Sequence, residues 1–265
     1  MTLRAEAAQR RRRLQAMIGA GLAVVVVLVG VVLLVSLTGT DKKNNKTAAS
    51  ASTSPTSCRW KPLVDPSTSP KPEMPAGIKE VGTPPASGEP RTGTQTMTIT
   101  TNLGAIKIEM DLAKTPCTAA SFTHLAGKHF FDNSACHRLV AGIHALQCGD
   151  PGGQGTGGPT YRFANEYLPT DRRPAYAKGS VAMANGGAQS PDSNGSQFFF
   201  LFDDVDSQQL SPDYTLWGKV TAGLDIIEKV AAGGDDGAYE PQPGGGHPKM
   251  ELKFLSVTVS APNKA

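Results

Sequence analysis

Short runs of alternating apolar and polar residues fill the chain after residue 93, and this alternation is typical of strands with one buried face. Residues 96–100 and 106–110 alternate on either side of Asn102-Leu103-Gly104, which predicts a β-hairpin. Further strands are expected, between glycine-rich loops, at 136–140, 144–149, 180–185, 197–202, 215–220 and 251–259. The pattern therefore predicts eight short strands.

Two segments follow a helical pattern instead. Residues 116–126 begin with Pro116, which suits the first position of a helix, and are followed by Gly127. Residues 223–232 carry apolar residues at three-residue steps and end before two glycines. This combination favours a mainly β fold, a closed eight-stranded antiparallel β-barrel capped by two helices, because closure leaves no sheet edge exposed.

An uncharged apolar run at residues 17–37 is long enough to cross a bilayer as one transmembrane helix. Four consecutive arginines precede it at 10–13, and this positive charge favours a cytoplasmic tail at residues 1–16 with the rest of the chain outside the cytoplasm. We expect an uncleaved, single-pass anchor in the cell membrane. The alternative is a cleaved signal peptide, whose apolar region is usually about 7–15 residues long.

Residues 38–93 are rich in Ser, Thr, Pro, Lys and Ala and show no helical or strand period. Such a composition cannot bury enough apolar surface to offset the chain entropy lost on folding. We expect a disordered stalk here, followed by a folded domain at residues 94–260. Cys58 either has no structural role in this stalk or joins a disulfide that ties the stalk to the domain.

The basic charge of the chain belongs to its N-terminal third. Residues 1–93 contain 13 Lys and Arg against 6 Asp and Glu, a net charge of +7, whereas residues 94–265 contain 13 against 17, a net charge of −4. A net acidic domain argues against a nucleic-acid surface.

One cation of the domain has an unusual setting. Arg138 lies in the run Cys136-His137-Arg138-Leu139, and Gln147 follows in Gln147-Cys148-Gly149-Asp150. An arginine keeps its charge, so apolar surroundings are unfavourable for it unless it binds something. This run is therefore the candidate centre of the functional site.

A series of motifs accompanies Arg138 in a fixed order along the domain. They are Phe122, Phe130-Phe131-Asp132, Cys136-His137-Arg138-Leu139, Gln147-Cys148-Gly149-Asp150, Gly155-Thr156-Gly157-Gly158, Ser180-Val181-Ala182-Met183-Ala184-Asn185, Asn194-Gly195-Ser196-Gln197-Phe198-Phe199 and Trp217-Gly218-Lys219-Val220. This order resembles the cyclophilins, peptidyl-prolyl cis-trans isomerases of eight-stranded barrel fold. The resemblance covers roughly residues 95–260 and looks most like the membrane-tethered, extracytoplasmic cyclophilins of high-GC Gram-positive bacteria.

The resemblance implies a role for each matching residue. Arg138 would donate a hydrogen bond to the nitrogen of a twisted X-Pro amide, and Gln147 would orient Arg138 and the peptide; these two are the expected catalytic residues. The expected substrate-binding residues are His144, Gly155, Ala184, Asn185, Gln197, Phe199, Leu210 and Tyr214. The chemistry implied needs no cofactor and no metal ion, and we expect a monomer.

Several positions depart from the family's pattern. Counted back from Gln147, His144 and Ala145 replace the aromatic residue and the methionine that usually form the floor of the proline pocket, and this stretch is one residue longer. Gln209 and Tyr214 stand where eukaryotic members often have tryptophan and histidine. We therefore expect weak cyclosporin binding.

Other chemistries fit the sequence less well. The four histidines between residues 124 and 144 lack the carboxylate or cysteine spacing of a metal site. Ser196, His137 and Asp150 could form a hydrolase triad, but Ser196 lacks the Gly-x-Ser-x-Gly elbow of many hydrolases. The glycine-rich segment 152–158 lacks the Lys-Ser/Thr of a phosphate-binding loop.

Four cysteines, in a segment expected outside the cytoplasm, predict two disulfides: Cys58, Cys117, Cys136 and Cys148. Three pairings are possible. We favour Cys117–Cys136, which would link the first helix to the strand that carries Arg138. Four buried thiols are the alternative.

The sequence thus predicts a membrane-anchored peptidyl-prolyl isomerase that acts on proline-containing segments of unfolded or exported proteins. A non-catalytic proline-peptide binding or chaperone module on the same barrel is the alternative, favoured by His144 and Ala145. A third possibility is a scaffold that binds other proteins through its rim loops.

Overall fold

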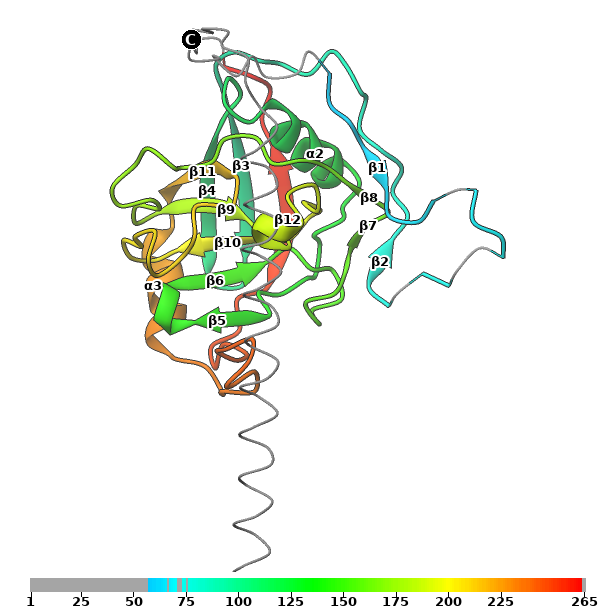
Figure 1. Cartoon of the computed structure of the whole chain (residues 1–265). Coiled ribbons are helices and arrows are strands. Elements are labelled where there is room, and N and C mark those ends of the chain that lie inside the picture. The colour runs from blue at the N-terminus through cyan, green and yellow to red at the C-terminus, as the bar shows by residue number, and fades with distance from the viewer. Residues whose placement is uncertain (1–56, 66, 71–72, 75, 264–265) are drawn as a thin grey trace, which may run out of the picture. The chain divides into compact units, whose positions relative to one another are not determined.

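The computed structural model describes residues 57–65, 67–70, 73–74 and 76–263 (Figure 1). All of them belong to one compact unit, which spans residues 53–265. The expected cytoplasmic tail at 1–16 and transmembrane helix at 17–37 lie outside the described residues. Within the described ranges, no helix combines the length and the apolar character needed to cross a bilayer.

An eight-stranded antiparallel sheet forms the body of this unit (Figure 1). In sheet order its strands are β12 (Phe254–Val259), β3 (Thr94–Thr101), β4 (Gly104–Asp111), β11 (Leu216–Ala222), β9 (Ser180–Met183), β10 (Phe198–Leu201), β6 (Ala145–Cys148) and β5 (Arg138–Val140). Each of the eight predicted strands is confirmed, with ends that differ by a few residues. The alternation of apolar and polar residues explains the β3–β4 hairpin, because the apolar positions face the main core. Fully buried there are Met97, Ile99, Ile106, Ile108 and Met110.

The sheet curls strongly, but the expected continuous closure is wrong. Strands β5 and β12 are the two edges, and no ladder joins them among the described residues. One isolated bridge joins Ala135, before β5, to Lys253, before β12, and another joins Leu139 of β5 itself to Gly246. Closure stops there because β5 is only three residues long and irregular chain lies opposite it.

Two α-helices pack against the sheet, as predicted. Helix α2 (Pro116–Gly127) packs against β12 and β4, and α3 (Leu224–Ala232) packs against β4. The main core between α2 and the sheet is aromatic: the ring of Phe122 stacks on Trp217 with centroids 4.3 Å apart and lies 5.6 Å from Phe198. Two 3-10 turns, η1 (Ala141–Ile143) and η2 (Gly187–Gln189), follow β5 and β9.

The second half of the expected stalk is folded onto the domain. Here the described residues between 57 and 93, which we call the arm, contain β1 (Lys61–Pro62) and β2 (Ile78–Lys79). Strand β1 pairs with β8 (Tyr161–Arg162), and β2 pairs with β7 (Gly158–Pro159). Strands of two residues are too short to show a hydrophobic period, and the composition of this segment predicted disorder. Strand pairing with β7 and β8 and a disulfide order it instead.

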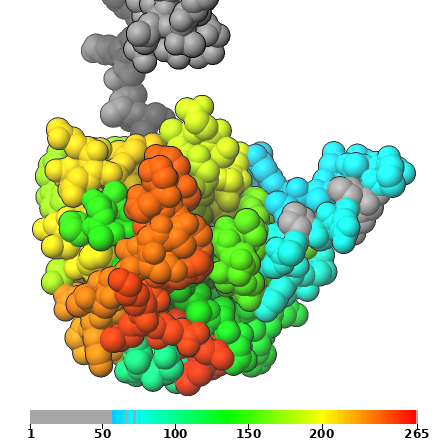
Figure 2. Space-filling view, turned by 90° about the horizontal axis from the view of Figure 1, so that it is seen from below, coloured from blue at the N-terminus to red at the C-terminus, as the bar shows by residue number. Residues whose placement is uncertain are grey.

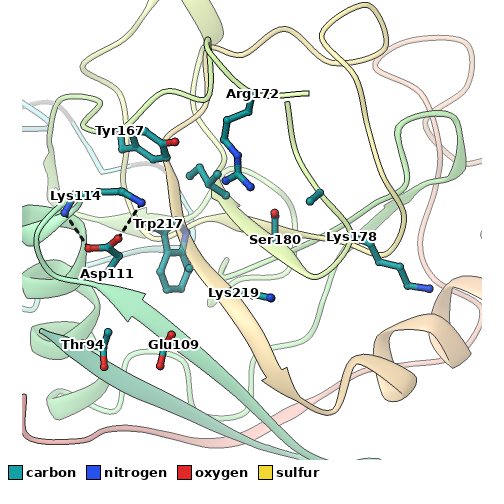
Figure 3. A pocket seen from close by; sticks show the side chains of 13 residues that line it. Thr94, Glu109, Asp111, Lys114, Tyr167, Arg172, Lys178, Ser180, Trp217 and Lys219 are labelled. Atoms are coloured by element: carbon teal, nitrogen blue, oxygen red, sulfur yellow. Dashed lines mark hydrogen bonds and ion pairs between the residues drawn. The ribbon is translucent and has the colours of Figure 1, made fainter. Parts of the chain in front are cut away.

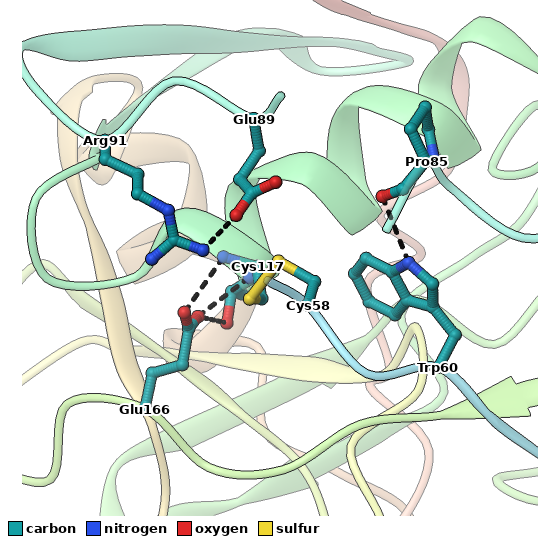
Figure 4. Close-up of a disulfide and its surroundings, with 8 residues drawn as sticks. Cys58, Trp60, Pro85, Glu89, Arg91, Cys117 and Glu166 are labelled. Carbon is teal, nitrogen blue, oxygen red and sulfur yellow. Dashed lines mark hydrogen bonds and ion pairs between the residues drawn. A yellow bond between two sulfur atoms is a disulfide. The ribbon is translucent and has the colours of Figure 1, made fainter. Parts of the chain in front are cut away.

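The disulfides are Cys58–Cys117 and Cys136–Cys148, so the expected Cys117–Cys136 pair is wrong. Strand pairing explains Cys136–Cys148, because the β5–β6 register places the residues just before β5 beside the end of β6. Cys117 lies on the buried side of α2, where the arm delivers Cys58 (Figure 4). The alternative in which Cys58 ties this segment to the domain is confirmed.

A carboxylate from a distant loop completes the N-terminus of α2. Glu166 accepts hydrogen bonds from the backbone N–H of Cys117 at 2.9 Å and of Thr118 at 2.8 Å (Figure 4). Burial raises the pKa of Glu166, and these hydrogen bonds act in the opposite direction. A negative group at this end of a helix also meets the positive end of the helix dipole, so Glu166 fixes the start of the helix that carries Cys117.

Candidate functional site

One face of the sheet carries the predicted site as a row across neighbouring strands. Arg138 on β5 lies opposite Gln147 on β6, and Gln147 lies opposite Phe199 on β10. The row continues to Ala182 on β9 and Leu216 on β11. Because residues directly opposite in antiparallel strands point to the same face, the sheet brings a cation, an amide and apolar side chains together.

The three phenylalanines of β10 divide between two clusters. Phe198 and Phe200 belong to the main core, whereas Phe199 belongs to a second apolar cluster, as expected from the alternation of side chains along a strand. The buried members of this second cluster are Ala145, Ala175, Tyr176, Ala182, Phe199, Leu201, Val205 and Leu216. Predicted residues Leu210 and Tyr214 pack on it from its rim, and the ring of Tyr214 meets Phe199 edge-on at 5.5 Å.

Arg138 lies at the β5 end of the row, beside Gln147, and hydrogen bonds hold its guanidinium in place. Its Nε donates to the carbonyl of Gly244 at 2.9 Å and its Nη2 to the carbonyl of Pro243 at 2.5 Å. Its Nη1 lies 3.5 Å from Oε1 of Gln147. Partial burial lowers the pKa of Arg138 from its usual value, but an arginine remains charged in proteins.

Gln147 also connects Arg138 to a polar hollow. Its Nε2 donates to Oε1 of Gln197 at 2.9 Å, and Nε2 of Gln197 donates to the carbonyls of Gly155 and Gly157 at 2.9 and 3.0 Å. A cavity of about 200 Å³ opens here. It is lined by Gln147, Gly155, Gly157, Arg162, Ala184, Asn185, Gly195, Ser196 and Gln197, so it gathers five of the predicted site residues.

The backbone at residues 184 and 185 is available in part. The N–H of Ala184 donates to the carbonyl of Gln197 at 2.9 Å. The carbonyl of Ala184 and the N–H of Asn185 bond to no other residue that the structure describes. The side chain of Asn185 serves the fold, because its Nδ2 donates to Asn165 at 2.9 Å and to Asn194 at 3.0 Å. An extended peptide could therefore pair with backbone groups here, while the Asn185 amide fixes the loop.

His144 lies apart from the other predicted residues. It follows η1 with a left-handed φ of 48°, and its ring meets Phe202 at 5.6 Å. Ile143 packs against the second apolar cluster instead. Ile143 and Ala145 therefore form this side of the second apolar cluster, and the role of His144 in substrate binding stays a prediction.

His137, which precedes Arg138 in the chain, is a buried and neutral histidine. His137 is 5% exposed, and neither ring nitrogen has a hydrogen-bond partner among the described residues. Burial lowers its pKa to about 4. Its ring lies against Gly155, 3.6 Å from where a side chain on that glycine would begin. His137 therefore packs under the rim of the polar hollow, and it forms no triad with Ser196, whose hydroxyl donates to the carbonyl of Gly149 at 2.7 Å.

Asp150 accepts hydrogen bonds from the loop at the rim of the hollow, and the arm contacts the same loop. One carboxylate oxygen of Asp150 accepts from the N–H of Gly152 at 2.7 Å, and the other from Gln154 at 3.0 Å and Gly157 at 3.2 Å. The N–H of Gly158 donates to the carbonyl of Gly77 in the arm at 3.2 Å. The arm thus reaches the loop that receives Gln197.

A different hollow of about 270 Å³ lies over β4, β9 and β11 (Figure 3). It carries charges of both signs: Lys114 pairs with Asp111 at 3.2 Å, and Arg172 points into the hollow. None of the residues predicted for the site lines it. The hollow meets the row only at Leu216, which lies at the β11 end of the row and also lines the hollow.

Sequence reasoning missed the partners that hold Arg138. Pro243 and Gly244 lie in a glycine-rich segment about a hundred residues later, and no local pattern in that segment points to the site. The pairing of Leu139 with Gly246 brings this segment beside β5.

Comparison with known proteins agrees with this geometry. Residues 96–247 match the family model described as "Cyclophilin type peptidyl-prolyl cis-trans isomerase/CLD". The chain is 41% identical over 198 residues to "Probable peptidyl-prolyl cis-trans isomerase B" of Mycobacterium leprae, covering 68% of this chain and 62% of the relative. It is 40% identical over 176 residues to the protein of the same name from Mycobacterium tuberculosis, covering 62% of this chain and 54% of the relative. The matched parts thus span a little over half the length of these relatives.

Solved structures show the same fold. A cyclophilin type peptidyl-prolyl cis-trans isomerase of Cryptosporidium parvum superposes with a TM-score of 0.55 at 26% sequence identity, covering 64% of this chain and 99% of that one. A second crystal structure of that protein, in the presence of the dipeptide Ala-Pro, gives a TM-score of 0.53 at 25% identity, over 63% and 99% of the two chains.

Proposed function

Because the chain belongs to the cyclophilin-type peptidyl-prolyl cis-trans isomerase family, we propose that its folded part is a peptidyl-prolyl cis-trans isomerase. The observation that carries the proposal is the cross-strand row of Arg138, Gln147 and Phe199. It sets a fixed cation and an amide beside an apolar cluster. The Cryptosporidium parvum structure was solved in the presence of a proline dipeptide, which supports proline-containing peptides as the substrate class.

The reaction makes few demands on the protein. Rotation about an X-Pro bond has a barrier of about 18–20 kcal/mol because the amide loses its resonance, and no covalent bond forms or breaks. When the amide twists, its nitrogen gains a localised lone pair. A donor that is held where this lone pair develops stabilises the twisted state more than the planar one and lowers the barrier.

Arg138 is the donor that this site offers. Three of its five N–H groups point at Gly244, Pro243 and Gln147, which leaves two for the peptide. The second apolar cluster, with Phe199 and Tyr214 meeting edge-on at 5.5 Å, would hold the proline ring. The free backbone groups at 184 and 185 would align the peptide as strand-like recognition does.

Arg138→Ala tests this role. Loss of one preorganised donor costs about two to three powers of ten in rate, and we expect that loss in kcat/KM for isomerisation of a short proline peptide. Arg172→Ala, which changes the hollow of Figure 3 and none of the residues predicted for the site, is the matched control and should keep wild-type activity. Activity of Arg138→Ala within tenfold of wild type would refute the role. A wild-type protein that binds the peptide without turning it over would instead support the non-catalytic binding module.

We also propose that the protein acts outside the cytoplasm, anchored by residues 17–37, on unfolded or exported chains. The apolar length of that segment supports the anchor. Two disulfides within the domain support an oxidising compartment. Protease added to intact cells should degrade the domain, and a chain lacking residues 1–37 should leave the membrane fraction. A domain that becomes accessible only after the cells are lysed would contradict this location.

A further inference from the structure

We propose that the loop at residues 236–247, called here the clamp loop, is a device that positions Arg138 for isomerisation. It follows α3 and lies across the end of the unit seen in Figure 2, where the chain is coloured orange to red. The inference rests on the isomerase proposed above and adds positioning residues to it, namely Glu240 and Asp236.

The loop grips the guanidinium through backbone carbonyls only. Nε and Nη2 of Arg138 donate to Gly244 at 2.9 Å and Pro243 at 2.5 Å. Because the guanidinium is planar and rigid, hydrogen bonds from two of its nitrogens fix both its position and its plane. Carbonyls do this without neutralising the cation, so the charge stays available to a twisted amide. A carboxylate in their place would form a bidentate ion pair and occupy the same donors.

Glu240 holds the two carbonyls in place. Its Oε1 accepts from the N–H of Gly245 at 2.6 Å. The backbone of Tyr239 closes the same turn, because its carbonyl accepts from Gly244 at 2.9 Å and its N–H donates to Gly245 at 3.0 Å. Residues 239–245 thus form a small ring of bonds with the two gripping carbonyls on it.

Asp236 closes the base of the loop. Its Oδ1 accepts from the N–H of Ala238 at 3.0 Å and of His247 at 2.8 Å, and its Oδ2 lies 2.9 Å from Nδ1 of His247. Nε2 of His247 lies 2.7 Å from the hydroxyl of Tyr239. Hydrogen bonds from Ala238 and His247 lower the pKa of Asp236 to about 2, so the base stays formed well into the acid range.

The loop is fastened to the strand that carries Arg138. Leu139 exchanges backbone hydrogen bonds with Gly246, at 2.8 and 3.1 Å. Gly245 has a φ of 74°, and a side chain there would begin 2.0 Å from the carbonyl of Leu139, so only glycine allows this approach. The clamp loop and Arg138 therefore share one frame, and motion of the loop relative to β5 would misplace the donor.

Kinetics of Glu240→Ala test the clamp. Because a misplaced catalytic group lowers turnover more than binding, we expect kcat to fall about tenfold with KM within about twofold. Glu240→Gln, which keeps an acceptor oxygen for Gly245, should restore most of the loss. Asp235→Ala is the matched control: Asp235 accepts from the N–H of Gly237 at 2.8 Å but bonds to neither gripping residue, and its kcat should stay within twofold.

A double substitution separates positioning from a general loss of structure. If Glu240 acts through Arg138, then Glu240→Ala should cause no further loss in the Arg138→Ala background. The same tenfold fall in both backgrounds would overturn the proposal. Thermal unfolding of each variant shows that the compared proteins are folded.

NMR of the Arg138 Nε–H tests the clamp without turnover. We expect a slowly exchanging signal in the wild-type protein and about tenfold faster exchange in Glu240→Ala, with Asp235→Ala unchanged. Exchange in the wild-type protein as fast as that of a solvent-exposed arginine would overturn the clamp, even if the isomerase is active. A protected signal in a protein without isomerase activity would support the grip and refute the proposed function instead.

Discussion

Replacing Cys58 and Cys117 together by alanine should destabilise the domain by releasing the arm from α2. The bond closes a loop of 59 residues in sequence separation. Loop-closure entropy gives about 4 kcal/mol for a loop of this length at 25 °C. For a chain of this size, each kcal/mol changes the melting temperature by about 2–4 °C, so we expect a fall of about 8–16 °C.

The matched control is Cys136→Ala with Cys148→Ala. That disulfide spans a separation of 12 residues, for which the same entropy relation gives about 3 kcal/mol, and both of its ends lie in the β5–β6 region. The two double variants should therefore lose similar stability but differ in where they open. Hydrogen exchange at the amide of Leu63, which donates to Thr160 at 2.8 Å across β1 and β8, should accelerate only when Cys58 is replaced.

Circular dichroism against temperature and exchange followed by NMR give both readouts. A Cys58/Cys117 variant that melts within about 2 °C of the wild-type protein would refute the entropy argument. Unchanged exchange at Leu63 would show that the pairing of β1 with β8, and not the disulfide, holds the arm. Loss of protection at Gly158 as well would connect the arm to the rim of the polar hollow, because Gly158 donates to Gly77 at 3.2 Å.

Three further outcomes are expected. Burial lowers the pKa of His137 to about 4, so as the pH falls the unfolded chain binds a proton at His137 before the native protein does. The free energy of unfolding should therefore be highest above about pH 6.5 and fall by about 3 kcal/mol as the pH drops to 4. Urea unfolding at several pH values measures this, and His137→Phe should flatten the dependence. Phe122→Ala should cost about 3–5 kcal/mol, because the ring is fully buried and stacks on Trp217; a cost under 1 kcal/mol in the same assay would contradict its place in the core. Cyclosporin should inhibit weakly, because Gln209 and Tyr214 stand at the positions named above, and tight inhibition in a titration would be the opposite result.

Local patterns were sufficient for the elements of the sheet and for a pair of motif residues that the sheet brings together. The alternation of residues 96–110 predicts the β3–β4 hairpin because one face of each strand is buried, and Met97, Ile99, Ile106 and Ile108 are indeed fully buried. The ordered motifs around Arg138 and Gln147 predict a pair that the strand register places directly opposite each other. These features depend on residues close in sequence or on a motif order that the chain carries in itself.

The position of His144 depends on a turn that the sequence pattern does not show. His144 was expected in the pocket floor; in the structure it follows the 3-10 turn at Ala141–Ile143, and its ring meets Phe202. Ile143, and not His144, packs on the second apolar cluster. A one-residue insertion leaves no mark in composition or period, so only backbone geometry shows where it is accommodated.

The sequence by itself determined the strands of the eight-stranded sheet, the two segments that form helices, and that one permanent cation needs a partner. Only the tertiary structure decided which cysteines pair, that the chain from residue 57 is folded onto the domain, and what holds Arg138. Each of these depends on segments far apart in sequence: 59 residues separate Cys58 from Cys117, and 106 separate Arg138 from Gly244. Hydrophobic period reports which side of an element is buried, but it carries no information about which distant segment lies against that side.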